Sequence, residues 1–74
     1  MEDLGMTRRS AKVVRVSDGG VAYTRDCSTN KFTVFTFGKI AGYRGQTAKE
    51  LGLRRGKTVT VEYNDDNEVF LVVI

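Results

Sequence analysis

The 74-residue sequence contains no histidine, no proline and no tryptophan, and it has one cysteine, Cys27. Without histidine or a second cysteine, the usual Cys/His zinc site is excluded, and the Ser-His-Asp and Cys-His catalytic arrangements lack their base. A disulfide within the chain is excluded for the same reason. No two carboxylates are placed on opposed strands in an apolar setting that would separate their pKa values. We therefore expect a protein that is not an enzyme and that carries no metal or cofactor.

Long hydrophobic runs are also missing. The longest, Val69–Ile74, is far shorter than the roughly 20 residues that a membrane helix needs. The single thiol and the lack of an apolar signal segment indicate the reducing cytoplasm. A chain of this length buries only about 60% of its unfolded surface, so we expect one small domain with a modest core.

Basic residues are concentrated in the first half of the chain. Residues 11–44 hold six Lys or Arg against two Asp, whereas residues 45–74 hold four against five acidic residues. An excess of positive charge on one part of a small domain is typical of a surface that follows a phosphate backbone. A basic protein with no such partner is the other interpretation of the same charge pattern.

The sequence pattern predicts a mainly β domain over residues 11–74, preceded by a mobile tail over residues 1–10. Aromatic and β-branched residues favour strands, and glycine-containing or polar turns separate them. The expected strands are Ala11–Val16, Val21–Arg25, Lys31–Ile40 (with the strand ending at Gly38), Thr58–Tyr63 and Glu68–Ile74.

Alternation within the strands predicts which side chains face the core. In the fourth strand, Val59, Val61 and Tyr63 are expected to point inward. In the second strand, the small residues Ala22 and Thr24 suit the interior of a narrow barrel. The phenylalanine-rich strand is apolar on both faces. The pattern therefore does not decide whether its even or its odd positions face the core.

A short helix is expected between the third and fourth strands. Thr47 and Glu50 have the spacing of a capping box, and Gly52 is placed to end the helix in a left-handed conformation. The order of three strands, a short helix and two strands predicts a five-stranded Greek-key barrel of the OB type. A small SH3-like barrel is the alternative.

Three segments resemble the cold-shock domain: GVAYT at 20–24, FGKI at 37–40 and GKTVTVE at 56–62. The resemblance implies binding of single-stranded RNA or DNA by base stacking on aromatic side chains of the second and third strands. Tyr23 and Phe37 match two of those aromatics. Val21, Val34 and Thr36 stand where the family has Phe, Phe and His, and the strand-one Trp has no counterpart. The resemblance therefore implies a reduced stacking platform with weaker and less base-dependent binding.

A second, shorter resemblance covers residues 51–62, LGLRRGKTVTVE. This segment is similar to the LGL-x-x-G-x-x-V segment of the AbrB-type swapped-hairpin DNA-binding fold, which forms an interleaved dimer. The strand before that segment usually contains a proline in the family, and this chain has none.

We predict a small single-stranded nucleic-acid-binding protein, with RNA as the expected partner. Bases would stack on aromatics, phosphates would bind cations, and Tyr43 and Arg44 would lie at the rim. The candidate residues are Lys12, Arg15, Tyr23, Arg25, Lys31, Phe37, Lys39, Tyr43 and Arg44. Two alternatives remain: an assembly module that pairs with another protein subunit through the apolar C-terminal strand, and an AbrB-like DNA-binding dimer.

Overall fold

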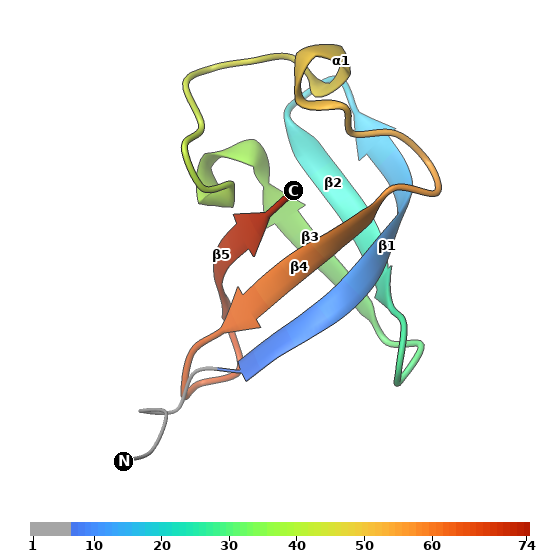
Figure 1. Cartoon of the computed structure of the whole chain (residues 1–74), viewed down its shortest axis with the longest axis vertical. Helices are drawn as coiled ribbons and strands as arrows, with labels where there is room; N and C mark the ends of the chain where they lie inside the picture. Colours follow the sequence, from blue (N-terminus) through green and yellow to red (C-terminus); the bar gives the residue numbers. More distant parts are fainter. Residues whose placement is uncertain (1–6) are drawn as a thin grey trace.

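Five antiparallel strands and very little helix make up the computed structural model, which describes residues 7–74. The sheet has the order β3-β2-β1-β4-β5 (Figure 1). This confirms the expected mainly β, five-stranded architecture. The elements are β1 (Thr7–Ser17), β2 (Val21–Asp26), β3 (Phe32–Thr36), the 3-10 turn η1 (Phe37–Lys39), α1 (Ala48–Leu51), β4 (Thr58–Tyr63) and β5 (Val69–Val73).

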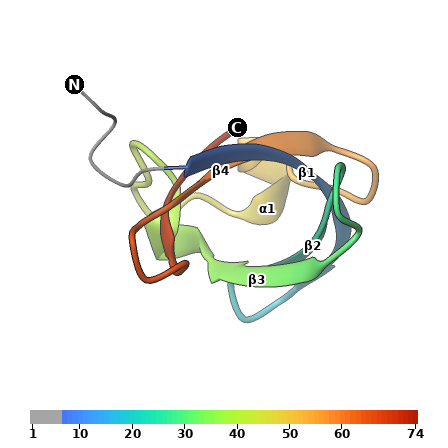
Figure 2. The ribbon, with the colours of Figure 1, turned by 90° about the horizontal axis from the view of Figure 1, so that it is seen from below.

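The central strand β1 bends and so curls the sheet. Its first half, Thr7–Lys12, pairs with β4, and its second half, Ala11–Ser17, pairs with β2. A β-bulge interrupts the pairing with β2 between Val13 and Arg15. Bulges bend a strand and increase its twist. The sheet consequently forms a half-barrel, which Figure 2 shows from its end.

The observed start of β1 corrects the expected tail. Thr7 pairs with Tyr63 and Ser10 pairs with Thr60, so residues 7–10 belong to the strand. Arg8 adds an ion pair, with its Nε 3.2 Å from Oε2 of Glu62. These residues show no alternation of apolar side chains, and their strand conformation comes from backbone pairing with β4. The first six residues of the expected tail lie outside the described part of the chain.

The phenylalanine-rich strand is shorter than expected. It ends at Thr36, and the chain then turns through η1, where the Ile40 N–H donates to the Phe37 carbonyl oxygen at 3.0 Å. The Phe37 N–H donates to the carbonyl oxygen of Gly20 at 2.9 Å. This bond holds the turn against the β1–β2 loop and brings the Phe37 ring into the core.

The core fills the concave side of the half-barrel. As predicted, Val59, Val61 and Tyr63 point inward from β4, and Ala22 and Thr24 point inward from β2. The buried apolar residues form one cluster, as expected of a single small domain. Its other members are Ala11, Val13, Phe35, Phe37, Ile40, Leu53 and Val72.

The predicted capping box is present at α1. The Glu50 N–H donates to the Thr47 hydroxyl at 3.2 Å, and the Thr47 N–H donates to Oε1 of Glu50 at 2.8 Å. Gly52 ends the helix with φ of 75°, in the left-handed region that glycine tolerates best. Leu53 then enters the core, so α1 is anchored at one end of the half-barrel (Figure 1).

The two outer strands of the sheet approach each other only in places. Ile40, just after η1, forms a parallel bridge with Val72 of β5, and the Ala41 N–H donates to the Val72 carbonyl oxygen at 2.8 Å. Nearer the other end, the Thr33 and Tyr63 hydroxyl oxygens lie 2.9 Å apart. Backbone bonds therefore close the gap near η1, whereas near the β2–β3 loop the side-chain bond joins β3 to β4 and leaves β3 and β5 unpaired.

Candidate nucleic-acid interface

Four of the predicted site residues lie together on the outer face of β1 and β2. Lys12 is paired with Arg25, and Arg15 is paired with Tyr23. Directly paired residues of antiparallel strands point to the same face. The Arg15 guanidinium carbon lies 5.4 Å from the centre of the Tyr23 ring, within the range of a cation–π contact. The arginine thereby covers part of the ring and is held close to the sheet.

The structure resolves which face of β3 is buried. Phe35 is 3% exposed and faces the core, whereas Phe32 is 71% exposed and Val34 is 50% exposed. Phe32 is paired with Arg25, and Val34 is paired with Tyr23. The outer face of three strands therefore carries two cross-strand rows. We call these six residues the outer strip: Lys12, Arg25 and Phe32 in one row, and Arg15, Tyr23 and Val34 in the other.

The outer strip combines charge with exposed apolar surface. It has three cations and no acidic side chain, and its aromatic rings come from β2 and β3. Exposed aromatic faces next to fixed cations suit planar, negatively charged ligands, because the rings stack and the cations attract the charge.

Phe37 is a correction to the predicted site. It is 6% exposed, and its ring meets the Tyr43 ring edge-on, with centroids 6.0 Å apart and planes at 74°. Tyr43 is half-buried against the core, and its hydroxyl donates to the Gln46 carbonyl oxygen at 3.2 Å. Phe37 therefore presents no ring face for stacking, because the chain leaves the sheet at Thr36 and turns this side chain inward.

The remaining predicted cations are exposed but lie elsewhere. Lys31 precedes β3 and lines a pocket, Lys39 ends η1, and Arg44 lies in the loop before α1. The Arg44 N–H donates to Oε1 of Gln46 at 2.6 Å, which fixes the backbone of this loop. The structure does not bring these three residues into the outer strip.

Phe32 is the functional candidate that the sequence interpretation missed. The β2–β3 loop determines the position of Phe32, because its closing residue pair sets the register of β3. The Asp26 N–H donates to the Lys31 carbonyl oxygen at 2.8 Å, and Asn30 has a left-handed φ of 63°. Counting outward from this closing pair places Arg25 opposite Phe32. Loop length thus sets the register, as it does in hairpins generally.

Asp26 holds that loop in place. Its Oδ1 accepts hydrogen bonds from the N–H groups of Ser28 and Thr29, at 2.7 and 2.9 Å. The Thr29 N–H, then the Ser28 N–H, lower the pKa of this carboxyl below its ordinary value of 3.8, and the nearby charge of Arg9 acts in the same direction. Because these hydrogen bonds favour the ionised carboxylate, protonation of Asp26 at low pH weakens the loop conformation that sets the register of β3.

We expect Asp26 to contribute to the pH dependence of stability. Its pKa is lower in the folded chain, so the stabilisation is present above the ordinary carboxyl pKa and is lost as the pH falls through the folded value. In Asp26→Asn the amide oxygen still accepts hydrogen bonds but carries no charge. Thermal unfolding between about pH 5 and pH 2 should therefore show a smaller loss of Tm in the variant than in the native chain. Equal losses would contradict this role.

Comparisons with protein-family models, with curated protein sequences and with solved structures found no match for this chain. Within residues 7–74, no three histidine, cysteine, aspartate or glutamate side chains gather as a metal site would require. The helical segments in the same residues are three and four residues long, too short to cross a bilayer.

Proposed function

We propose that this protein binds single-stranded nucleic acid, with RNA as the expected partner, across the outer strip. The observation that carries the proposal is the pair of cross-strand rows, which hold three cations, the exposed Phe32 ring and the partly exposed Tyr23 ring and no acidic residue. Bases would stack on Phe32 and Tyr23, and phosphates would bind the three cations. Such a surface is tolerant of sequence because every base has a face that can stack.

We further propose that the half-barrel is a barrel of the OB type. The sheet order and the parallel bridge between Ile40 and Val72 support this topology, because β5 lies between β4 and the end of β3. The position of α1 between β3 and β4 also agrees with it. Barrels of this type bind oligonucleotides on the face formed by their second and third strands, which contribute most of the outer strip.

The expected affinity follows from the few contacts available. Base–aromatic stacking contributes about 1–3 kcal/mol per base, and the strip provides two such rings. Three cations add an electrostatic contribution that weakens with salt, because each phosphate contact releases counterions. We therefore expect binding of about micromolar strength, with modest base preference.

Fluorescence anisotropy tests the proposal directly. Labelled single-stranded RNA and DNA of about eight nucleotides lie within the site size of one such barrel. Titrations at about 50 and 200 mM salt should show binding that weakens steeply at the higher concentration. Absence of binding at the lower concentration, where electrostatic attraction is strongest, would refute the proposal.

Single arginine replacements should change the salt dependence. In Arg15→Gln or Arg25→Gln, one phosphate contact is lost, so the slope of log K against log salt should become shallower by about 0.7. Arg44→Gln is the matched control, because Arg44 is exposed but lies outside the outer strip. An equal effect of all three replacements would indicate general attraction to a basic protein rather than binding at this face.

A second candidate function is assembly with another protein through β5. Phe70, Val73 and Ile74 are large apolar side chains exposed near the C-terminal end of the sheet. Light scattering on the same samples distinguishes the two proposals. A mass that rises with concentration, together with no binding of nucleic acid, would favour assembly, and a stable dimer that binds duplex DNA would favour the AbrB-like alternative.

A further inference from the structure

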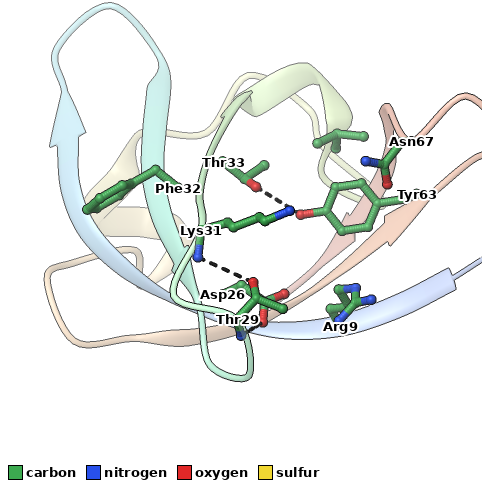
Figure 3. A pocket seen from close by; sticks show the side chains of 9 residues that line it. Arg9, Asp26, Thr29, Lys31, Phe32, Thr33, Tyr63 and Asn67 are labelled. Carbon is green, nitrogen blue, oxygen red and sulfur yellow. Dashed lines mark hydrogen bonds between the residues drawn. The ribbon is translucent and has the colours of Figure 1, made fainter.

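A pocket of about 320 Å³ opens between the β2–β3 and β4–β5 loops (Figure 3), at the end of the half-barrel away from α1 (Figure 1). Each of the five strands contributes at least one residue to its wall, namely Arg9, Asp26, Phe32 with Thr33, Tyr63 and Val69. The pocket lies where β3 and β5 are not joined by backbone pairing. Its volume is at the lower end of the range for small-molecule sites, so it suits a compact ligand.

Two hydroxyl groups in this wall provide a hydrogen-bond donor. The Tyr63 and Thr33 oxygens are 2.9 Å apart, and one hydroxyl donates to the other. Their mutual bond uses one of the two protons, so the second proton is available to a ligand. The Thr24 hydroxyl donates to the Thr33 carbonyl oxygen at 3.0 Å, which keeps this part of β3 in position.

Two cations stand at the same pocket. Arg9 is paired with Val61, whose side chain is in the core, so Arg9 lies on the concave face of β1. Figure 3 shows the side chain of Lys31 extending toward Tyr63. The acidic residue of the wall, Asp26, already accepts hydrogen bonds from two backbone N–H groups. The lining as a whole has an excess of one positive charge.

We propose that this pocket binds the phosphate group of a small organic phosphate. The pocket offers hydrogen-bond donors from a guanidinium, an ammonium, a hydroxyl and the side-chain amide of Asn67. These donors outnumber what the two oxygens of a carboxylate can use, and they suit the three terminal oxygens of a phosphate. Val69 offers apolar surface for the organic part. The phosphate comes either from a free metabolite or from the phosphorylated end of a nucleic-acid strand.

The pocket is separate from the proposed nucleic-acid interface. Its polar strand residues lie on the concave side of the sheet and the others lie in the β2–β3 and β4–β5 loops, whereas the outer strip lies on the opposite face of the sheet. Only Phe32 borders both, and Figure 3 shows its ring pointing away from Tyr63. Binding of a phosphate here therefore does not depend on binding of nucleic acid across the outer strip.

An NMR titration of amide shifts with ribose 5-phosphate tests this site, with ribose as the ligand that lacks only the phosphate. The expected result is a set of saturable shifts around Arg9, Thr33 and Tyr63 with the phosphate and none with ribose. In Arg9→Gln the affinity should fall at least about tenfold, because a charged hydrogen bond is lost. Arg8→Gln is the matched control, since Arg8 pairs with Glu62 on the other face and should leave binding unchanged.

A second variant, Tyr63→Phe with Thr33→Val, removes both hydroxyls of the pair and should also weaken binding while the fold, checked by its amide spectrum, is kept. Oligomers with a 5′-phosphate or a 5′-hydroxyl identify the source. Pocket shifts that appear only with the phosphorylated oligomer assign the site to strand ends, and shifts with ribose 5-phosphate assign it to free metabolites. Equal binding of ribose, equal effects of the two arginine variants, or no pocket shifts with any phosphate would overturn the proposal.

Discussion

Replacing Tyr23 and Phe32 together by alanine is expected to weaken binding of single-stranded RNA by about 30-fold or more. Each ring should stack one base, and each stack contributes about 1–3 kcal/mol. Loss of both removes about 2 kcal/mol at the least, and a factor of ten corresponds to about 1.4 kcal/mol. Anisotropy at one fixed salt concentration measures the change. The two residues lie in neighbouring rows of the outer strip, so they act on neighbouring parts of the ligand.

Two variants separate stacking from other effects. Phe70→Ala removes another exposed ring, this one from β5 outside the outer strip, and should leave the affinity unchanged. Tyr23→Phe keeps the ring and should bind nearly as well as the native chain. If the double alanine variant binds with native affinity while the arginine variants change the salt slope, the interface is purely electrostatic and the stacking part of the proposal is wrong.

Local signals in the sequence predicted several elements correctly. In β4, Val59, Val61 and Tyr63 alternate with polar residues, and the strand has the predicted bounds. The capping box at α1 was also predictable, because its two residues are three apart and bond to each other's backbone. In both cases the residues that determine the structure are neighbours in the chain, so the pattern alone was sufficient.

The phenylalanine-rich strand shows where local pattern fails. Phe32, Phe35 and Phe37 are equally apolar, yet one is exposed on the outer face, one is buried in the strand and one is buried beyond it. The difference depends on pairing with β2 and on the turn at Thr36. Hydrophobicity therefore selected Phe37 as a stacking residue, whereas register places Phe32 beside Arg25.

The pocket could not be predicted from the sequence for a related reason. Its lining residues come from all five strands and from the β2–β3 and β4–β5 loops, and Arg9 lies in a segment that the sequence assigned to a mobile tail. Only the pairing of β1 with β4 places Arg9 opposite Val61 and next to the hydroxyl pair of Thr33 and Tyr63. Contacts between distant parts of the chain define this site, and no spacing along the sequence encodes them.

Phe35→Ala is expected to have the largest effect on stability, lowering the free energy of unfolding by about 3–5 kcal/mol. Phe35 is buried and is paired with Ala22, whose small side chain cannot fill the cavity that the lost ring would leave. Globular domains have about 0.05–0.15 kcal/mol of stability per residue, so a 74-residue chain has about 4–11 kcal/mol in total. The variant should therefore lose a large share of its total stability and unfold at a markedly lower urea concentration than the native chain. Urea unfolding followed by circular dichroism measures the loss.

Phe32→Ala is the matched comparison, because it makes the same chemical change three positions earlier on the opposite face of β3. Phe32 is mostly exposed, so its replacement should change the free energy of unfolding by less than about 1 kcal/mol. The two variants should thus have opposite profiles, with Phe35→Ala losing stability and Phe32→Ala losing affinity while it remains folded. Equal losses of stability would mean that β3 does not have the register that places Phe32 on the outer strip, and the interface built on that register would fail with it.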